Sequence, residues 1–245
     1  MSERGFVQPI ASALHALKRM PSLVVWAILI VVEIASRAML RIILPDPSLS
    51  SLLMVEPVFA VVRALIGGVL TFYLARTLVA PNTRHARPLY GRFVGLFVAS
   101  GLITWLISGI GRVVIFAGEP SQFMMTYGSI LVGSFGAIVT FAFLVRMLTA
   151  AAGSLEPRLG GTLAFAFREG WSAYVWYTIC AILFPVLMVY TFHNVLGPGN
   201  EANDLAGNFL QSVITGTGSV LQYLLAVVVA QCTLPDARRL AETFA

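Results

Sequence analysis

The sequence contains very little charge. Only 11% of its 245 residues are Asp, Glu, Lys or Arg, whereas 58% are hydrophobic, and the mean hydropathy is +0.86. A soluble domain normally has about 25% charged residues. A chain so poor in charge cannot cover a globule with polar surface, so lipid must be the solvent for most of it. The composition therefore predicts an all-α integral membrane protein.

Cysteine and histidine are also scarce. The two cysteines, Cys180 and Cys232, form no CxxC pair, so no disulfide framework beyond a single bridge is possible. The three histidines fall outside the apolar blocks, which argues against haem held between helices. The sequence has no P-loop, G-x-S-x-G motif or nucleotide fingerprint. We therefore expect no metal, no cofactor and no catalytic residue.

Negative charge is in the minority, since sixteen basic residues outnumber eleven acidic ones and leave a net charge of +5. In a soluble protein this excess would suggest nucleic acid. Here the basic residues lie mostly between apolar blocks, where they set topology and attract anionic headgroups. We exclude nucleic acid and expect the partners to be the lipid bilayer with anionic phospholipid, other membrane proteins and further copies of the chain.

Six apolar stretches are long enough to cross a hydrocarbon core of about 30 Å, which takes about 20 helical residues. We interpret residues 1–245 as one membrane domain. Residues 46–56 are expected to form a connector, after which Pro57 opens the second span. Ser129, Gly133 and Ala137 make a small-residue row that predicts close approach of a neighbouring helix. The expected spans are residues 22–44, 57–78, 93–116, 124–149, 171–192 and 208–230.

A short amphipathic segment, residues 7–20, precedes the first span, and a second lies within residues 150–170 before the fifth. Such helices lie along the membrane surface. The first apolar block begins about twenty residues into the chain, and Glu33 and Arg37 interrupt it. We therefore expect a retained span and not a signal peptide. The apolar side of the first segment consists of Val7, Ile10, Leu14 and Leu17.

The basic residues favour one side of the membrane. The connectors after the first, third and fifth spans contain Asp46, Glu119, Glu201 and Asp204 but no Lys or Arg. The N-terminal segment, the other connectors and the tail carry most of the basic residues. The positive-inside rule then places both termini in the cytoplasm of a bacterial inner membrane. The chain is expected to form three helical hairpins, with amphipathic cytoplasmic segments leading into them.

The first and fifth spans begin alike. When the chain is shifted by 150 residues, Trp26 aligns with Trp176. The pattern AFREGWSAYVWYTI, residues 166–179, is echoed by ALHALKRMPSLVVWAIL, residues 13–29. These two segments, together with the six expected spans, resemble a broad family of six-helix bacterial inner-membrane proteins. That family is related to the membrane domain of glycerophosphodiester phosphodiesterases. The resemblance implies an accessory or lipid-related role, and because this chain has no phosphodiesterase domain, it assigns no catalytic residue.

A group of charged residues within and beside the first three spans is the most informative feature. A charge at the centre of a membrane helix costs roughly 2.5 to 3.5 kcal/mol. We therefore expect each of these charged residues either to pair with an opposite charge or to serve a function. With both termini in the cytoplasm, these residues lie near the middle or in the outer half of the bilayer. The group consists of Glu33, Arg37, Arg41, Glu56, Arg63 and Arg112.

Three interpretations of this group stay open. In the first, Glu33 pairs with Arg37 or Arg63 and fastens the first two helices together, since Glu followed by Arg four residues later is a favourable helix pair. In the second, the group has a net charge of +2, from four arginines and two glutamates, and holds a lipid phosphate or a partner's carboxylate. The third, a proton or ion pathway, is weakened because Glu33 is the one deeply placed acid.

The sequence favours a non-enzymatic accessory, scaffold or assembly subunit that contacts lipid. The alternative is a component of a small-molecule or ion transporter or permease. A cavity lined by paired ionisable groups from several spans would favour the transporter. A flat lipid-facing surface with rows of small residues would favour the scaffold.

Overall fold

The computed structural model describes six segments of the chain, and each is almost entirely helical. The described residues are 5–43, 49–79, 88–116, 128–153, 171–191 and 201–233. They form seven α-helices and one π-helical segment, and they contain no strand. The elements are α1 (Gln8–Leu17), α2 (Met20–Ile43), α3 (Leu49–Leu74), η1 (Ala75–Val79), α4 (Tyr90–Phe116), α5 (Ser129–Ala151), α7 (Trp171–Thr191) and α8 (Glu201–Thr233).

Six of the described helices are long and apolar enough to cross a membrane. They are α2, α3 with its extension η1, α4, α5, α7 and α8. Inside lipid every backbone N–H and C=O group must be paired within the protein, and a single apolar segment achieves this only as a helix. The expected all-helical, multi-pass architecture is confirmed at this level.

Two helices begin before the ends of the connectors that were expected to precede them, although the sixth membrane-length stretch, Gly207–Cys232, agrees with the expected span. The connector expected up to residue 56 is too long, because α3 begins at Leu49 and Pro57 lies inside that helix. Membrane helices tolerate an internal proline, since neighbouring groups satisfy the freed backbone carbonyl. The loop expected before residue 208 is also too long, because α8 begins at Glu201. The sequence there, EANDLAG, contains Glu, Ala and Leu, which favour helix formation.

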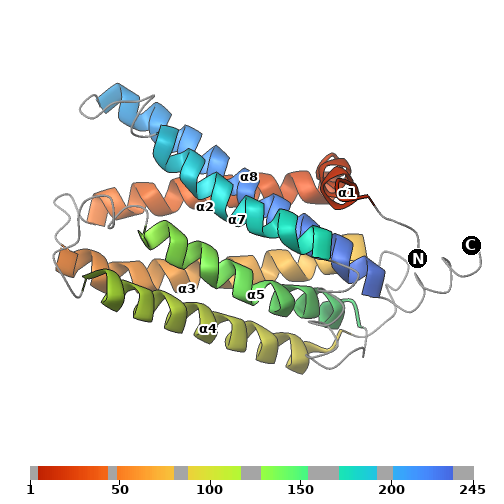
Figure 1. Cartoon of the computed structure of the whole chain (residues 1–245). Coiled ribbons are helices and arrows are strands. Elements are labelled where there is room, and N and C mark those ends of the chain that lie inside the picture. Colours follow the sequence, from red (N-terminus) through yellow and green to blue (C-terminus); the bar gives the residue numbers. More distant parts are fainter. Residues whose placement is uncertain are drawn as a thin grey trace, which may run out of the picture.

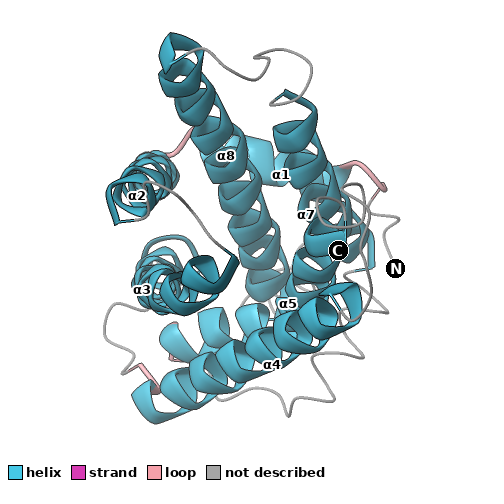
Figure 2. Ribbon diagram, turned by 90° about the vertical axis from the view of Figure 1, so that its left-hand side faces the viewer, coloured by secondary structure: helices cyan, strands magenta, loops and turns pink. Residues whose placement is uncertain are grey.

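Helix α8 forms the centre of the bundle (Figure 2). It packs against α1, α2, α5, α7 and η1, and 56% of its membrane-length stretch is buried. Helix α4 is peripheral, since only 6% of its corresponding stretch is buried. Helix α4 packs along α5, and α7 packs along α8. Helix α2 packs chiefly on α8 and meets α3 at few points.

Small side chains allow α2 to approach α8 closely. A Cβ atom added at Gly216 would lie 2.8 Å from Cγ1 of Ile30, so any larger residue at this position would push the two helices apart. Nearby, the indole Nε1 of Trp26 donates a hydrogen bond to Oγ1 of Thr217 over 3.0 Å. These contacts explain why α2 packs more extensively on α8 than on α3, its neighbour in sequence.

The bundle is packed most tightly at the end where α1 lies. Buried apolar residues of η1, α5 and α8 meet there, among them Leu78, Leu148 and Leu225. The side-chain amide of Gln231 on α8 donates to the carbonyl oxygen of Leu78 over 2.7 Å, which satisfies an acceptor in the last turn of η1. Toward the opposite end, α7 and α8 diverge from α3, α4 and α5 (Figure 1).

Helix α1 lies across this tightly packed end, and Figure 1 shows it nearly along its own axis while the long helices run across the view. It buries Pro9 and Ala13 against the bundle. Two residues of the expected apolar side, Val7 and Leu14, are 60% and 48% exposed. The second amphipathic segment, at residues 154–170, and the connectors that carry the topology signal lie largely outside the described residues.

Candidate functional site

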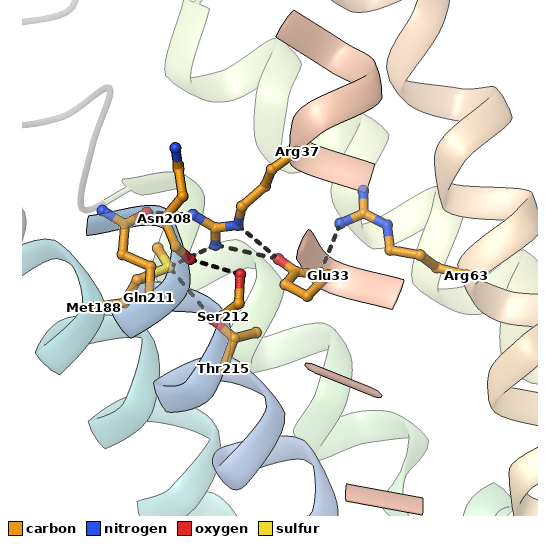
Figure 3. Close-up of polar contacts among 8 residues, drawn as sticks. All are labelled: Glu33, Arg37, Arg63, Met188, Asn208, Gln211, Ser212 and Thr215. Atoms are coloured by element: carbon orange, nitrogen blue, oxygen red, sulfur yellow. Dashed lines mark hydrogen bonds and ion pairs between the residues drawn. The ribbon is translucent and has the colours of Figure 1, made fainter. Parts of the chain in front are cut away.

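A carboxylate shared by two arginines is the centre of the candidate site. Glu33 lies in the middle of α2, and its two oxygen atoms face different partners (Figure 3). Its Oε1 accepts hydrogen bonds from Nε and Nη2 of Arg37, at 3.3 and 3.2 Å. Its Oε2 lies 3.7 Å from Nη1 of Arg63 on α3. Glu33 therefore pairs with both arginines that the sequence offered as alternatives.

Arg37 has further partners on two other helices. Its Nη1 donates a hydrogen bond to Oε1 of Gln211 on α8, and its Nη2 lies 3.4 Å from the sulfur of Met188 on α7. The same sulfur accepts a hydrogen bond from the hydroxyl of Thr215 at 3.5 Å. Arg37 is thus held by groups from α2, α7 and α8, as Figure 3 shows.

Arg63 is held much more loosely. Among the described residues its guanidinium makes one ion pair and no hydrogen bond. Its side chain is 37% exposed, against 22% for Arg37 and 16% for Glu33. A guanidinium carries five N–H donors, so most of those on Arg63 meet no described protein group. Two arginines and one glutamate leave this triad with a net charge of +1.

The other three members of the expected charged group cannot be added to the triad. The side chains of Arg41, Glu56 and Arg112 lie outside the described part of the structure, although their backbones belong to α2, α3 and α4. Their role in a lipid or partner site stays a prediction. The structure brings together Glu33, Arg37 and Arg63, from the first two spans.

A cavity of about 880 Å³ lies beside the triad. All six membrane-length helices contribute to its wall, and Glu33 and Arg63 are part of that wall. Three threonines of the wall, Thr71, Thr104 and Thr140, donate their hydroxyl hydrogens to carbonyls of their own helices. Cavities of roughly 300–1,000 Å³ with mainly apolar walls and a few polar groups are typical of small-molecule sites.

Helix α8 supplies a polar stripe to the cavity. Thr215, Ser219, Gln222 and Tyr223 line it at three- and four-residue spacing, which places them on one helix face. Neither Ser219 nor Gln222 has a hydrogen-bond partner within the described residues. A polar group in an apolar environment is costly without such a partner. These two side chains are therefore available to a molecule inside the cavity.

The cavity is open at its side, between α3 and α4. These helices meet near the α1 end, where the Phe72 ring stacks on Tyr90 and meets Phe93 edge-on. Farther along, several cavity residues of both helices are more than half exposed, which indicates access from the surrounding lipid. They are Val61, Leu65, Val98, Leu102 and Trp105.

The small-residue row on α5 was expected to let a neighbouring helix approach closely. At Gly133 it does not do so, and it forms part of the cavity wall instead. A Cβ added at Gly133 would meet nothing within 4 Å, and both Gly133 and Ala137 line the cavity. Close approach of α4 and α5 occurs instead at Gly111, where an added Cβ would lie 2.4 Å from Cγ2 of Val132.

A second cavity, of about 450 Å³, lies between α1, η1 and α8. One side of α1 lines it with Gln8, Ser12 and His15, followed by Arg19 beyond the helix. In the described ranges no three His, Cys, Asp or Glu side chains come together as they would to hold a metal ion.

Sequence reasoning missed the polar face of α8. Gln211, Thr215, Ser219 and Gln222 recur every three or four residues within an apolar span, and this spacing is the signal that identifies them. The partners of Arg37 on α7 and α8 had no such signal, because nothing in the sequence places those helices beside α2.

Comparison with models of known protein families, with curated proteins and with solved structures gave no significant match for this chain. The resemblance of its lead-in segments to the six-helix inner-membrane family therefore stays a prediction.

Proposed function

We propose that the protein binds an amphipathic small molecule in its central cavity and serves as the substrate-binding unit of a transporter or permease. The observation that carries the proposal is an 880 Å³ cavity whose wall includes the Glu33–Arg63 ion pair and the polar stripe of α8. A merely structural ion pair would need neither the adjoining space nor unpartnered polar groups facing it. The side opening suits a molecule that comes from the lipid phase.

The proposal includes an orientation in the bacterial inner membrane. The distribution of basic residues puts both termini in the cytoplasm, so that α1 lies at the cytoplasmic interface and its exposed Val7 and Leu14 contact lipid. The spans then form three hairpins that start and end on the cytoplasmic side. Glu33, Arg37 and Arg63 lie toward the periplasmic half.

The proposed role is binding and passage, without chemical conversion. The described residues that line the central cavity include no histidine, so among them the serine and threonine hydroxyls have no imidazole base.

An accessory or assembly subunit is the second candidate function, and the outer face of α4 favours it. This helix exposes large apolar residues along most of its length, including Val94, Ile110 and Val113. Such a surface suits either lipid or a helix of another membrane protein. In that case the central cavity would be occupied by a structural lipid.

Filling the cavity tests the first proposal. Gly133→Leu would send a side chain from α5 into the cavity, because a Cβ at this position meets no neighbouring atom. Gly95→Leu on α4 is the matched control, since a Cβ there also meets nothing and the residue does not line the cavity. Both changes replace a helical glycine with a better helix former.

The measurement is isolation from native membranes in mild detergent, followed by mass spectrometry of bound lipids and small amphiphiles. We expect one class of amphiphile to accompany the wild type and Gly95→Leu in stoichiometric amount and to be lost from Gly133→Leu. Equal retention by all three proteins would contradict a ligand in this cavity. Stoichiometric recovery of another membrane protein with all three would instead support the accessory role.

A further inference from the structure

We infer that Arg63 is the group that recognises the cavity's ligand, and that this ligand is an amphiphile with one oxyanion head group, a carboxylate or a phosphate. The inference rests on the proposed function, because it assumes that the central cavity is a binding site. It adds the chemical class of the ligand and the direction in which the ligand lies.

The two arginines of the triad differ in how many of their donors have partners. Arg37 directs its donors at Glu33, Gln211 and Met188. Arg63 has one ionic contact, at 3.7 Å, which is longer than a charge-assisted hydrogen bond of about 2.7–2.9 Å. An arginine in an apolar environment needs hydrogen-bond acceptors, and the described residues around Arg63 supply none. An oxyanion in the cavity would supply two in the fork geometry that a guanidinium prefers.

The net charge of the triad also favours an anionic ligand. Glu33 is shared between two guanidinium groups, so the triad keeps a net charge of +1 at the edge of a mainly apolar cavity. A bound anion with a single negative charge makes the local charge zero, and a doubly charged phosphate makes it negative. Because electrostatic attraction is strong where water is excluded, a neutral ligand of the same shape gains none of this stabilisation.

The length and lining of the cavity indicate the chemistry of the ligand beyond its head group. Arg63 and Thr71 both line it, and Thr71 is eight positions after Arg63 in the helix, so the cavity extends about 12 Å along α3 from the cationic end. Apolar residues of α3 and α4 form one wall, and Ser219 and Gln222 face the space from α8. The site therefore fits a hydrocarbon body with an ester, amide or hydroxyl group along one side.

Glu33 has a defined part in this site. Its Oε2 faces Arg63 without a hydrogen bond, so it holds the guanidinium near the cavity and competes with the ligand for it. Glu33→Gln keeps the size of the side chain and removes the competing charge. Anion binding should therefore become tighter in this variant, whereas a site for neutral molecules would not respond.

Three probes with the same acyl chain separate the possible head groups. Oleic acid carries a carboxylate, oleoyl lysophosphatidic acid carries a phosphate, and monoolein is uncharged. Binding to delipidated protein in detergent is measured by titration calorimetry or native mass spectrometry. We expect at least one anionic probe to bind about tenfold or more tightly than monoolein, because a hydrogen bond to a charged group contributes about 1.5–3 kcal/mol, which is a factor of roughly 10 to 150. The tighter of the two anions identifies the head group.

The variant test is Arg63→Gln. It should weaken binding of the preferred anion by roughly ten- to a hundredfold and leave monoolein binding unchanged, which also shows that the variant is folded. Arg63→Lys should restore part of the anion preference. Equal binding of monoolein and both anions to the wild type, or an unchanged preference in Arg63→Gln, would overturn the inference and leave the cavity proposal standing. Failure of all three probes, or binding that Gly133→Leu does not reduce, would instead count against the proposed function itself.

Discussion

Nη1 of Arg63 lies 3.7 Å from Oε2 of Glu33, and this is the one ion pair that the described residues place between α2 and α3. The other oxygen of the same carboxylate accepts hydrogen bonds from Arg37, whose own partners lie on α7 and α8. The triad therefore ties α2 firmly to the α7–α8 pair and loosely to α3. The loosely held arginine is also the one that faces the central cavity.

The two ion pairs of Glu33 should differ in their effect on stability. Removing a hydrogen-bonded charged partner from a largely buried group costs about 1.5–3 kcal/mol, whereas more exposed ion pairs contribute about 1 kcal/mol or less. We expect Arg37→Gln to destabilise by the larger amount and Arg63→Gln by the smaller. Unfolding in mixed detergent micelles measures both. Lys18→Gln, at an exposed position next to α1, is the control.

Glu33 and Arg37 should also be coupled. Changing Glu33 to Gln should destabilise the protein less when Arg37 has already been changed to Gln, because the loss of the carboxylate then leaves only Arg63, and no longer Arg37, without its ionic partner. A double-mutant cycle in the same unfolding assay gives the coupling energy. Purely additive losses would show that the contact seen between these two side chains does not stabilise the fold.

The glycines of α4 should respond in opposite ways to a methyl group. An alanine at Gly111 would place its Cβ 2.4 Å from Val132, so we expect a loss of about 1–3 kcal/mol from the forced separation of α4 and α5. Gly109 has nothing within 4 Å of the same position, and Gly109→Ala should be neutral or stabilising by up to about 1 kcal/mol. Thermal unfolding of the two variants side by side measures the difference. Equal stability would contradict the close contact of the helices.

The hydrogen bond from Gln231 to the carbonyl of Leu78 should stabilise the end of η1. Gln231→Leu removes the donor and leaves the carbonyl without this partner, which costs about 1–3 kcal/mol. Gln8→Ala on α1 borders the same second cavity and is the control, since among the described residues its side chain has no hydrogen-bond partner. Hydrogen exchange of residues 75–79 should increase in Gln231→Leu and stay unchanged in the control.

The proposed topology has its own test. Reporter fusions after residues 46, 120 and 196, between the long helices, should all report a periplasmic position. A fusion after residue 84, between η1 and α4, should report the cytoplasm. A cytoplasmic result at any of the first three positions would contradict the orientation and, with it, the placement of the triad in the periplasmic half.

The sequence by itself determined the class of the protein and the position of its long helices. Low charge and long apolar runs leave the backbone no other way to satisfy its hydrogen bonds in lipid, so the spans follow from composition and length alone. The depth of Glu33 in its helix, and the spacing that lets it meet Arg37, also follow from the sequence, because both are local properties of α2.

Only the tertiary structure decided which helices lie side by side. Surfaces that face lipid and surfaces that face other helices are both mainly apolar, so the sequence did not reveal that α2 packs on α8 or that Arg37 reaches Gln211 and Met188. For the same reason it did not show that Gly133 borders a cavity while Gly111 borders a neighbouring helix. All six long helices contribute to the wall of the cavity beside Arg63, so the cavity is a property of the packed bundle and of no single helix.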